Sequence, residues 1–489
     1  MAIAYTHGAY GVMAKTISHI ADIGSTVAVY VGTVPVNLIR GYDAYVNTPI
    51  KLTSMSDVLA YCGYSAAWDK FTLCEAFKLH FDNPDGNIGP IVAINVMDPV
   101  AHSKTEQTTA ELSVVNGHAS IVSDTIILDT LKINGKVEGT DYTVSYDHTV
   151  GRVELVFADG STEKLRATYT EVDPTTVTAE HIIGKATDDG NYTGLGCVEL
   201  IYQYLDLVPN MILAPGWSIN PDVCKAMVKA ATGINGHWLA VAYADIPLAD
   251  GGQKIDTKAA AIKWHQDHGY NTTDTLTPFW PKAPGTDGNI YHLSTMWAWR
   301  QMQVDMSNGG LPFETASNKP APITGQYFGK DSTNRGFDQR AANDLNAAGI
   351  TTICYWGGRW VLWGPHTGAF SHGNVDDERC IFGSNVRMLM HVLNQFQLDN
   401  ADMVDRPMTR SMADSIRNKE QEKVDAWAAM GAFVGSPVVE FVRTDNTVSD
   451  MVNGVFQWQF RGTTTPALLS ATMKGAYTTE GINSYYGEV

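Results

Sequence analysis

The chain has 489 residues, too many for one ordinary core, so we expect about two to four domains. A hydrophobic content of 44% and an aromatic content of 10% exclude a disordered chain. The net charge of −18 argues against a nucleic-acid or anionic-membrane partner, because either would need a basic surface.

Targeting and redox signals are weak. The six cysteines form no CxxC pair and read as reduced, mostly buried thiols. The first residues lack the charged-then-apolar order of a signal peptide, and no apolar run is long enough to predict a transmembrane helix. We therefore expect a soluble protein that folds in a cytoplasm.

The N-terminal part predicts an arm followed by an α/β core. Residues 1–25 carry few large apolar side chains and resemble an extended arm. Thr26–Thr33 and Pro90–Val96 are apolar, β-branched runs typical of buried strands, and Trp68–Phe81 has helical spacing. This alternation predicts the first part of the core over 26–102.

Residues 103–187 predict an inserted antiparallel β domain. Short alternating stretches are separated by turn sequences such as NG, EGTD and ADGS. The α/β pattern resumes over 188–345, with strands expected at 211–215, 238–245 and 291–299. Helices are expected at Pro221–Thr232 and Lys258–Gly269, and a long loop at Asn308–Lys330.

The last unit, 346–489, begins within the last turn of a helix that ends at Gly349. Strands Ile350–Trp356 and Arg359–Trp363 follow, joined by a two-glycine turn, and then helices at Ser384–Asp399 and Thr409–Phe433. Further on, Phe456, Trp458 and Phe460 alternate with polar residues, VVEFVR (438–443) reads as a short strand, and Ala467–Met473 reads as a return strand. Both ends of the chain thus predict strand-forming arms without a place in their own subunit, and unpaired strand edges favour pairing with another chain.

A motif spans the helix end and the hairpin. It reads Leu345-Asn346-Ala347-Ala348-Gly349-Ile350 and then Trp363-Gly364-Pro365-His366-Thr367. This resembles the C-terminal signature of contractile-tail sheath proteins, which is Leu-Asn-x-x-Gly-Ile, an apolar strand, a glycine turn and Trp-Gly-x-x-Thr. Pro365-His366 departs from the Ala-Arg of many relatives.

The resemblance implies a mixed-sheet α/β core with an inserted β-sandwich-like domain and strand-donating arms. It implies a structural subunit, without catalytic site, cofactor or metal, that polymerises helically around a tail tube and contracts from a metastable extended state to drive the tube through a cell envelope. Its partners would be further copies of itself, the tube protein, and baseplate and terminator proteins, in a virion tail assembled in the host cytoplasm. Subunit contacts are expected at Ile3, Tyr5, Tyr10, Val12, Val455, Phe456, Trp458, Phe460, Leu468, Leu469, Met473 and Tyr477.

Other sites have weaker support. His366, His372, Asp376 and Asp377 lie close in sequence, but their spacing matches no metal motif. Gly325–Lys330 falls one residue short of a P-loop. Tyr355, Trp356, Trp360 and Trp363 could form a sugar platform, although their place in strands favours core or interface packing. The alternative function is a glycan-binding or adhesion protein that uses the inserted β domain.

Overall fold

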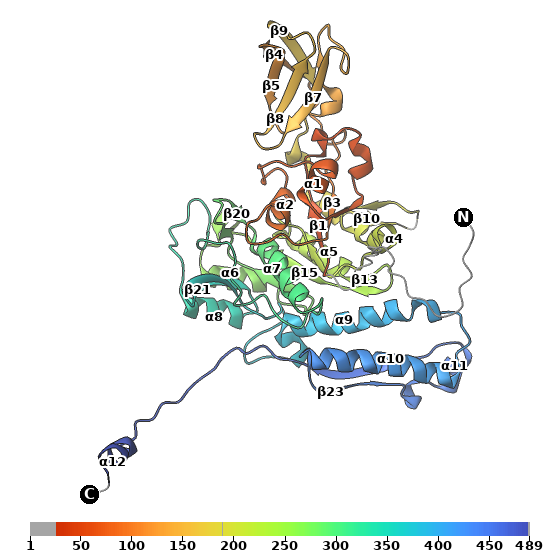
Figure 1. Cartoon of the computed structure of the whole chain (residues 1–489), viewed down its shortest axis with the longest axis vertical. Helices are drawn as coiled ribbons and strands as arrows, with labels where there is room; N and C mark the ends of the chain where they lie inside the picture. The colour runs from red at the N-terminus through yellow and green to blue at the C-terminus, as the bar shows by residue number, and fades with distance from the viewer. Residues whose placement is uncertain (1–25, 188, 488–489) are drawn as a thin grey trace, which may run out of the picture.

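The computed structural model describes residues 26–187 and 189–487, so the expected arm 1–25, with Ile3, Tyr5, Tyr10 and Val12, lies outside the described residues. The described molecule is elongated, with a β domain at one end, an α/β body in the middle and a helical layer at the other end (Figure 1). The predicted mixed α/β class is confirmed.

A six-stranded sheet forms the centre of the body, in the order β18-β15-β12-β1-β3-β2. Neighbouring strands are parallel except for β2, an edge strand that runs antiparallel to β3. Every residue of β1, β3 and β15 is buried, as in strands covered on both faces. The strands are β1 (Ala28–Gly32), β2 (Pro49–Leu52), β3 (Ile91–Asn95), β12 (Met211–Leu213), β15 (Val241–Asp245) and β18 (Leu276–Phe279).

The helices of the body begin at recognisable caps. The Asn220 side chain accepts hydrogen bonds from the backbone N–H groups of Asp222 and Val223, and Pro221 occupies the first turn of α5. Ser54 and Asp57 form a capping box at the start of α1. The helices are α1 (Met55–Tyr61), α2 (Cys74–Phe81), α3 (Ala179–Ile183), α4 (Ile201–Leu205), α5 (Pro221–Ala230), α6 (Lys258–Asp267), α7 (Leu293–Ser307) and α8 (Gln339–Ala347).

One predicted strand is wrong, because residues 291–299 lead into helix α7 rather than forming a buried strand. The helix packs against α2 and against β12, β15 and β18 of the sheet, so nearly all of its first residues are buried. All residues of Leu293–Trp299 are buried, so this part of the helix shows no amphipathic period, and a short, mostly apolar window of it resembles a buried strand. The other strands of the body are short and are β10 (Lys185–Ala186), β11 (Tyr192–Thr193), β13 (Thr232–Ile234), β14 (Trp238–Leu239), β16 (Ala249–Asp250), β17 (Gln253–Lys254), β19 (Ala283–Pro284) and β20 (Ile290–Tyr291).

The β domain at the far end consists of two three-stranded antiparallel sheets, β4-β9-β6 and β5-β8-β7. It has its own hydrophobic core, which includes Leu112, Leu155 and Phe157. The alternation seen in the sequence places these side chains inward and polar neighbours outward. The strands are β4 (Thr108–Val114), β5 (His118–Val122), β6 (Lys132–Ile133), β7 (Tyr142–Asp147), β8 (Arg152–Phe157) and β9 (Glu163–Tyr169).

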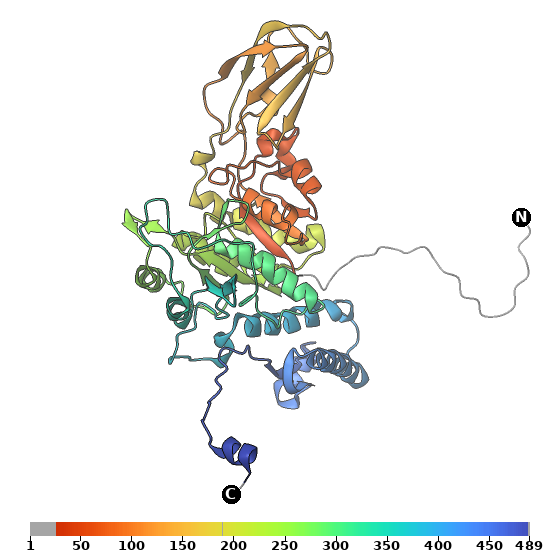
Figure 2. The same cartoon turned by 60° about the vertical axis from the view of Figure 1, so that its left-hand side comes forward.

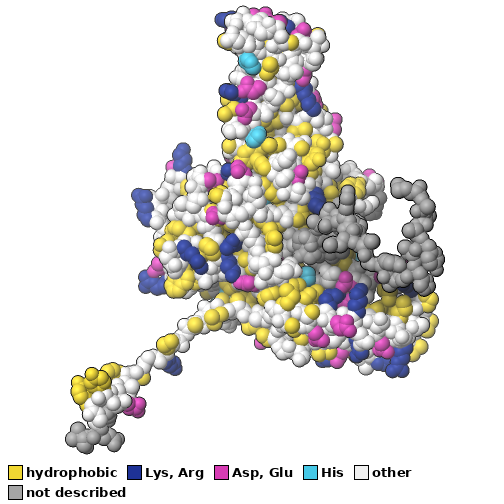
Figure 3. All heavy atoms as spheres, in the orientation of Figure 1, with side chains coloured by type: hydrophobic (Ala, Val, Ile, Leu, Met, Phe, Trp, Pro, Cys, Tyr) yellow, Lys and Arg dark blue, Asp and Glu magenta, His cyan; other side chains and the backbone are white. Residues whose placement is uncertain are grey.

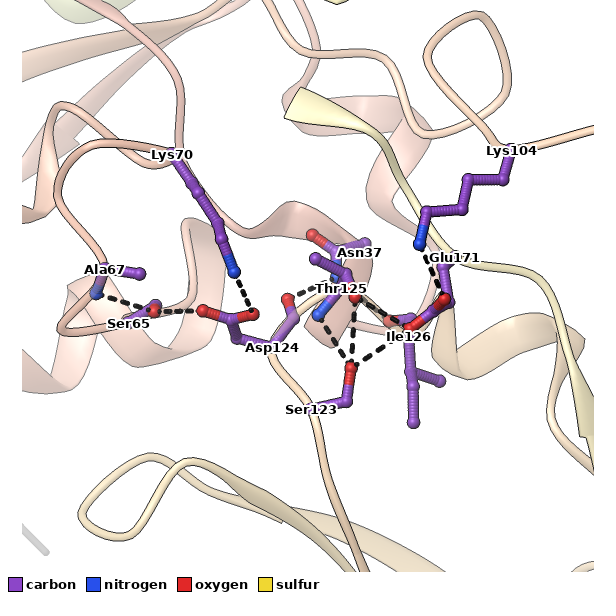
Figure 4. A network of polar contacts seen from close by, with 10 residues as sticks. All are labelled: Asn37, Ser65, Ala67, Lys70, Lys104, Ser123, Asp124, Thr125, Ile126 and Glu171. Carbon is purple, nitrogen blue, oxygen red and sulfur yellow. Dashed lines mark hydrogen bonds and ion pairs between the residues drawn. The ribbon is translucent and has the colours of Figure 1, made fainter. Parts of the chain in front are cut away.

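A polar network joins this β domain to the body (Figure 4). The buried Asn37 side chain donates to the backbone carbonyls of Asp124 and Ile126, at 3.0 and 2.9 Å. Ser65 and Lys70 of the body hold the Asp124 carboxylate, at 2.7 and 3.4 Å. The joint therefore fixes the domain to the body through several hydrogen bonds in addition to the two connecting chains.

The helical layer at the opposite end contains α9, α10 and a two-stranded ribbon, β23–β24. Helix α10 begins after Thr409, whose hydroxyl caps the Met412 N–H, and it ends at Ala429 rather than at the expected Phe433. Phe433 instead begins β23. The elements are α9 (Gly383–Asp399), α10 (Arg410–Ala429), β23 (Phe433–Glu440), α11 (Val448–Val452), β24 (Gln459–Thr464) and α12 (Glu480–Tyr486). No helix in the described ranges is long and apolar enough to span a bilayer.

An ion pair fastens this layer to the body. Arg387 of α9 pairs with Asp305 of α7, and their side chains are 5% and 0% exposed. The Asp305 carboxylate also accepts from Thr26 Oγ1 at 2.6 Å and from Gln301 Nε2 at 2.8 Å. Burial raises the cost of separating these charges, so the contact favours a rigid connection.

Candidate subunit interface

The motif residues lie together where α8 meets the hairpin formed by β21 (Thr352–Trp356) and β22 (Arg359–Trp363). Leu345 is fully buried in the main core, next to Ile350. The Asn346 amide donates to the carbonyls of Ile350 and Trp363, at 2.9 and 3.1 Å. One side chain thus binds both the loop before the hairpin and the end of its second strand.

The two motif glycines are required by close contacts with the backbone or with the Asn346 side chain. Gly349 has φ +78°, and a Cβ there would lie 2.7–2.9 Å from three carbonyl oxygens of residues 367, 368 and 370. At Gly364, φ is +126° and a Cβ would lie 2.4 Å from Asn346 Nδ2. Thr367 donates its hydroxyl to the carbonyl of Cys380 at 2.6 Å. Together these contacts give the motif an architectural role, since every polar group named here is used within the fold.

The loop after the hairpin holds His366 within the protein. Its ring stacks on Phe370 with centroids 3.7 Å apart, and Nδ1 lies 2.6 Å from the carbonyl oxygen of Ile381. Burial lowers the pKa of this histidine, which favours the neutral ring. His372, Asp376 and Asp377 are exposed, and the described residues contain no group of three such side chains arranged to hold a metal ion.

The aromatic residues of the hairpin divide into two environments. Tyr355 and Trp356, next to the turn, are 58% and 46% exposed, so of the predicted core or interface packing only the interface alternative remains for these two. Trp360 and Trp363 are partly buried, and each contacts one of the exposed rings. Exposed aromatic rings of this kind suit a protein interface.

The ribbon β23–β24 is the part of the expected strand-exchange unit that the structure describes. Its strands pair antiparallel, with Val438 opposite Arg461, Val439 opposite Phe460 and Glu440 opposite Gln459. The alternating segment forms a strand only from Gln459 onward, and it pairs within its own chain. That pairing corrects the expectation that this segment lacks a place in its own subunit.

The predicted contact residues between 455 and 460 lie in different environments. Val455 is exposed, whereas Phe456 and Trp458 pack against Phe441. The Trp458 indole N–H also reaches the Ala413 carbonyl at 3.3 Å, and Phe460 packs against Phe433 in the core of this layer. Trp458 and Phe460 therefore attach the ribbon to the helices beneath it.

The tail beyond β24 stands clear of the body in two views (Figures 1 and 2). Leu468, Leu469, Met473 and Tyr477 are 83%, 58%, 95% and 87% exposed. The expected return strand at 467–473 is wrong for this single chain, because the segment has no regular structure and residues 466–477 form no hydrogen bond with described residues. Apolar side chains in a segment without intramolecular partners are suited to contact with another molecule (Figure 3).

Sequence reasoning missed two contacts in this layer. The Arg387–Asp305 pair joins residues 82 positions apart, and neither lies in a recognisable pattern. Gln421 of α10 hydrogen-bonds the backbone of β23, at Pro437 and Val439. A polar residue on a helix gives no signal of this kind, because the contact depends on how the helix lies against the strand.

Comparisons with known proteins support the resemblance. No protein-family model matches the sequence. The chain is 27% identical over 440 residues to the tail sheath protein of Burkholderia phage BcepMu, covering 85% of each chain. It is 24% identical over 301 residues to a putative prophage major tail sheath protein of Pseudomonas aeruginosa strain UCBPP-PA14, covering 59% of this chain and 70% of the relative.

The fold also has a counterpart among solved structures. A chain in the cryo-EM structure of the anti-feeding prophage baseplate matches 98% of this chain with a TM-score of 0.55, at 12% sequence identity, and is itself covered completely. The chain is therefore homologous to a phage tail sheath protein over most of its length, and its fold occurs in a chain of the anti-feeding prophage baseplate.

Proposed function

We propose that this chain, a homologue of phage tail sheath proteins, is the structural subunit of a contractile tail sheath. It polymerises helically around an inner tail tube and contracts from a metastable extended state, which drives the tube through a cell envelope. The observation that carries the proposal is the homology over 85% of both chains, which includes the body as well as the C-terminal layer. This is a mechanical role in a virion or related particle, and it requires no catalytic site.

Strand exchange is the proposed means of assembly. The exposed tail, with Leu468, Leu469, Met473 and Tyr477, supplies a strand to the β23–β24 ribbon of a second copy. The arm residues Ile3, Tyr5, Tyr10 and Val12 are proposed to supply another. Backbone pairing suits a polymer that rearranges, since it depends little on side-chain identity and persists while rigid bodies rotate.

Further partners follow from this role. The sheath would contact a baseplate at one end and a terminator protein at the other, with the tube protein inside. Assembly would take place in the host bacterial cytoplasm, without a cofactor. Contraction would require that subunit contacts be more favourable in the contracted state, because only a difference in interaction energy moves such an equilibrium.

The alternative, a glycan-binding or adhesion protein, is less well supported. It would use the inserted β domain as the functional part and leave the rest as a scaffold. The homology extends through the scaffold, and the exposed tail has no role in a monomeric binder.

Negative-stain electron microscopy of the purified protein tests the proposal. The full chain is compared with a variant that ends at Thr465, with and without a co-expressed tube protein. The full chain should form hollow tubes. The truncated chain should fold but stay monomeric, because the tail forms no hydrogen bond with the described body and is needed only for contact with a second copy. A full chain that stays monomeric in both conditions would contradict the sheath function, and tubes from the truncated chain would contradict strand donation by the tail.

A further inference from the structure

The two edges of the β23–β24 ribbon differ in their hydrogen bonding. On the outer edge of β23, away from β24, Gln421 Nε2 donates to the Pro437 carbonyl at 2.9 Å. Its Oε1 accepts from the Val439 N–H at 2.8 Å. A single amide side chain thus makes the donor and acceptor contacts that a paired strand would make.

Other features protect this same edge. Pro437 has no N–H to offer an incoming strand, and the ladder is irregular between Val434 and Val438. Gly435 in this irregular stretch has φ +74°, which turns the chain away from an extended path. Asp425, one turn along α10, accepts a hydrogen bond from Gln421 Nε2 at 2.8 Å and orients the amide. Proline, a bulge and a covering helix are the means by which proteins prevent strand addition at an edge.

The outer edge of β24 has no such protection. Because the Val439 N–H points toward Gln421, Val439 and its partner Phe460 form a pair that does not exchange backbone hydrogen bonds. The backbone groups of Phe460, and of Gly462 two residues on, therefore point to the free side of β24. Within the described chain, neither residue has a backbone hydrogen bond on that side.

From this asymmetry we infer that the ribbon accepts strands in a fixed order. The free edge of β24 receives the first strand, from segment 467–473 of a second copy of this chain. The edge of β23 remains closed by Gln421 until the amide is displaced. This inference rests on the proposed sheath function and adds an order to its strand exchange.

The second copy is the occupant that the exposed tail favours. Segment 467–473 carries Leu468, Leu469 and Met473, which the described part of the chain leaves 83%, 58% and 95% exposed. It leaves the body at the end of β24 and extends away from the ribbon (Figures 1 and 2). An apolar, unpaired segment and an unpaired edge in the same polypeptide are complementary when two copies meet.

The test compares Gln421→Ala with the wild type in tube formation followed by light scattering and electron microscopy. Removing the amide frees the Pro437 carbonyl and the Val439 N–H and leaves the other protections in place. The lag before polymerisation should then shorten roughly tenfold, which corresponds to about 1.4 kcal/mol. The matched control is Asn418→Ala on the same helix, where the side chain's only hydrogen bond within the described residues is the one it accepts from Arg417. An unchanged lag in Gln421→Ala, or a loss of polymerisation by a folded variant, would overturn the inference.

Hydrogen exchange measured by mass spectrometry gives a second readout. In the free wild-type subunit, the Val439 amide should exchange slowly and those of Phe460 and Gly462 rapidly. In Gln421→Ala the Val439 amide should become fast, and in wild-type tubes the β24 amides should become slow. Tubes in which the β24 amides stay fast would overturn the order of addition, whereas absence of wild-type tubes would count against the sheath function itself.

Discussion

The Arg387–Asp305 ion pair gives the most direct prediction about stability. Arg387→Met removes the guanidinium and keeps a similar side-chain length, so the Asp305 carboxylate stays buried with only Thr26 and Gln301 as hydrogen-bond donors. Breaking a buried pair on one side costs about 3–5 kcal/mol, because one charge is left uncompensated. The free energy of unfolding of the unassembled subunit should fall by that amount in urea titrations.

A double variant and a surface control make the reasoning refutable. Arg387→Met combined with Asp305→Asn removes the stranded charge and should recover most of the loss, with a coupling energy of roughly 2 kcal/mol. Arg406→Met removes an exposed pair with Asp402, whose side chains are 53% and 71% exposed, and should change stability by less than about 1 kcal/mol. A loss below about 1 kcal/mol in Arg387→Met, or a double variant no more stable than the single one, would refute the argument.

Three further predictions concern other parts of the fold. Gly349→Ala should lower the free energy of unfolding in urea by about 2–4 kcal/mol. Gly357 also has a positive φ but open space around it, so Gly357→Ala should lower the free energy of unfolding by roughly 1 kcal/mol. Equal losses in the two variants would contradict the close-contact argument. Replacing residues 104–171 with two glycines should leave a folded subunit that still forms tubes in electron microscopy. The reason is that the flanking residues, Ser103 and Val172, already form a β-bridge. A variant that does not fold would show that the body needs the β domain. Burial lowers the pKa of His80 from 6.5 to about 4, so its contribution to stability is fully present above pH 6.5 and is lost as the pH falls toward 4. In urea titrations across this range, the free energy of unfolding should fall less steeply with pH in His80→Gln than in the wild type. The same pH dependence in both proteins would exclude His80 as a cause.

The sequence predicts the strands of the body well because each is a short apolar run with turn residues at both ends, as at Ala28–Gly32 and Ile91–Asn95. It predicts the hairpin of the motif because Gly357 and Gly358 allow a tight turn. It fails at α7, where the first half of the helix is buried on every side and its sequence shows no amphipathic period.

The interface was harder to predict than the fold. The sequence predicts Phe460 at a subunit contact, but Phe460 lies in β24 opposite Val439 of β23 in the same chain. A local pattern does not reveal this pairing, because the two strands are separated by the segment that contains α11. The Gln421 contact could not be predicted, since it depends on the position of α10 beside β23. The sequence alone also does not show that the apolar tail residues Leu468 and Met473 are exposed. They are exposed because no surface of the described chain covers them.

The joint in Figure 4 has a consequence for how this protein can diversify. Asn37 binds the carbonyl groups of Asp124 and Ile126, which every amino acid possesses, so it constrains the path of the inserted chain and leaves most of its sequence free. The chain also enters and leaves the β domain at adjacent points, where the Lys104 N–H donates to the Glu171 carbonyl at 2.8 Å. The domain can therefore mutate, or be exchanged for another, at a pace separate from that of the body, and variants of this chain can carry different β domains on the same framework.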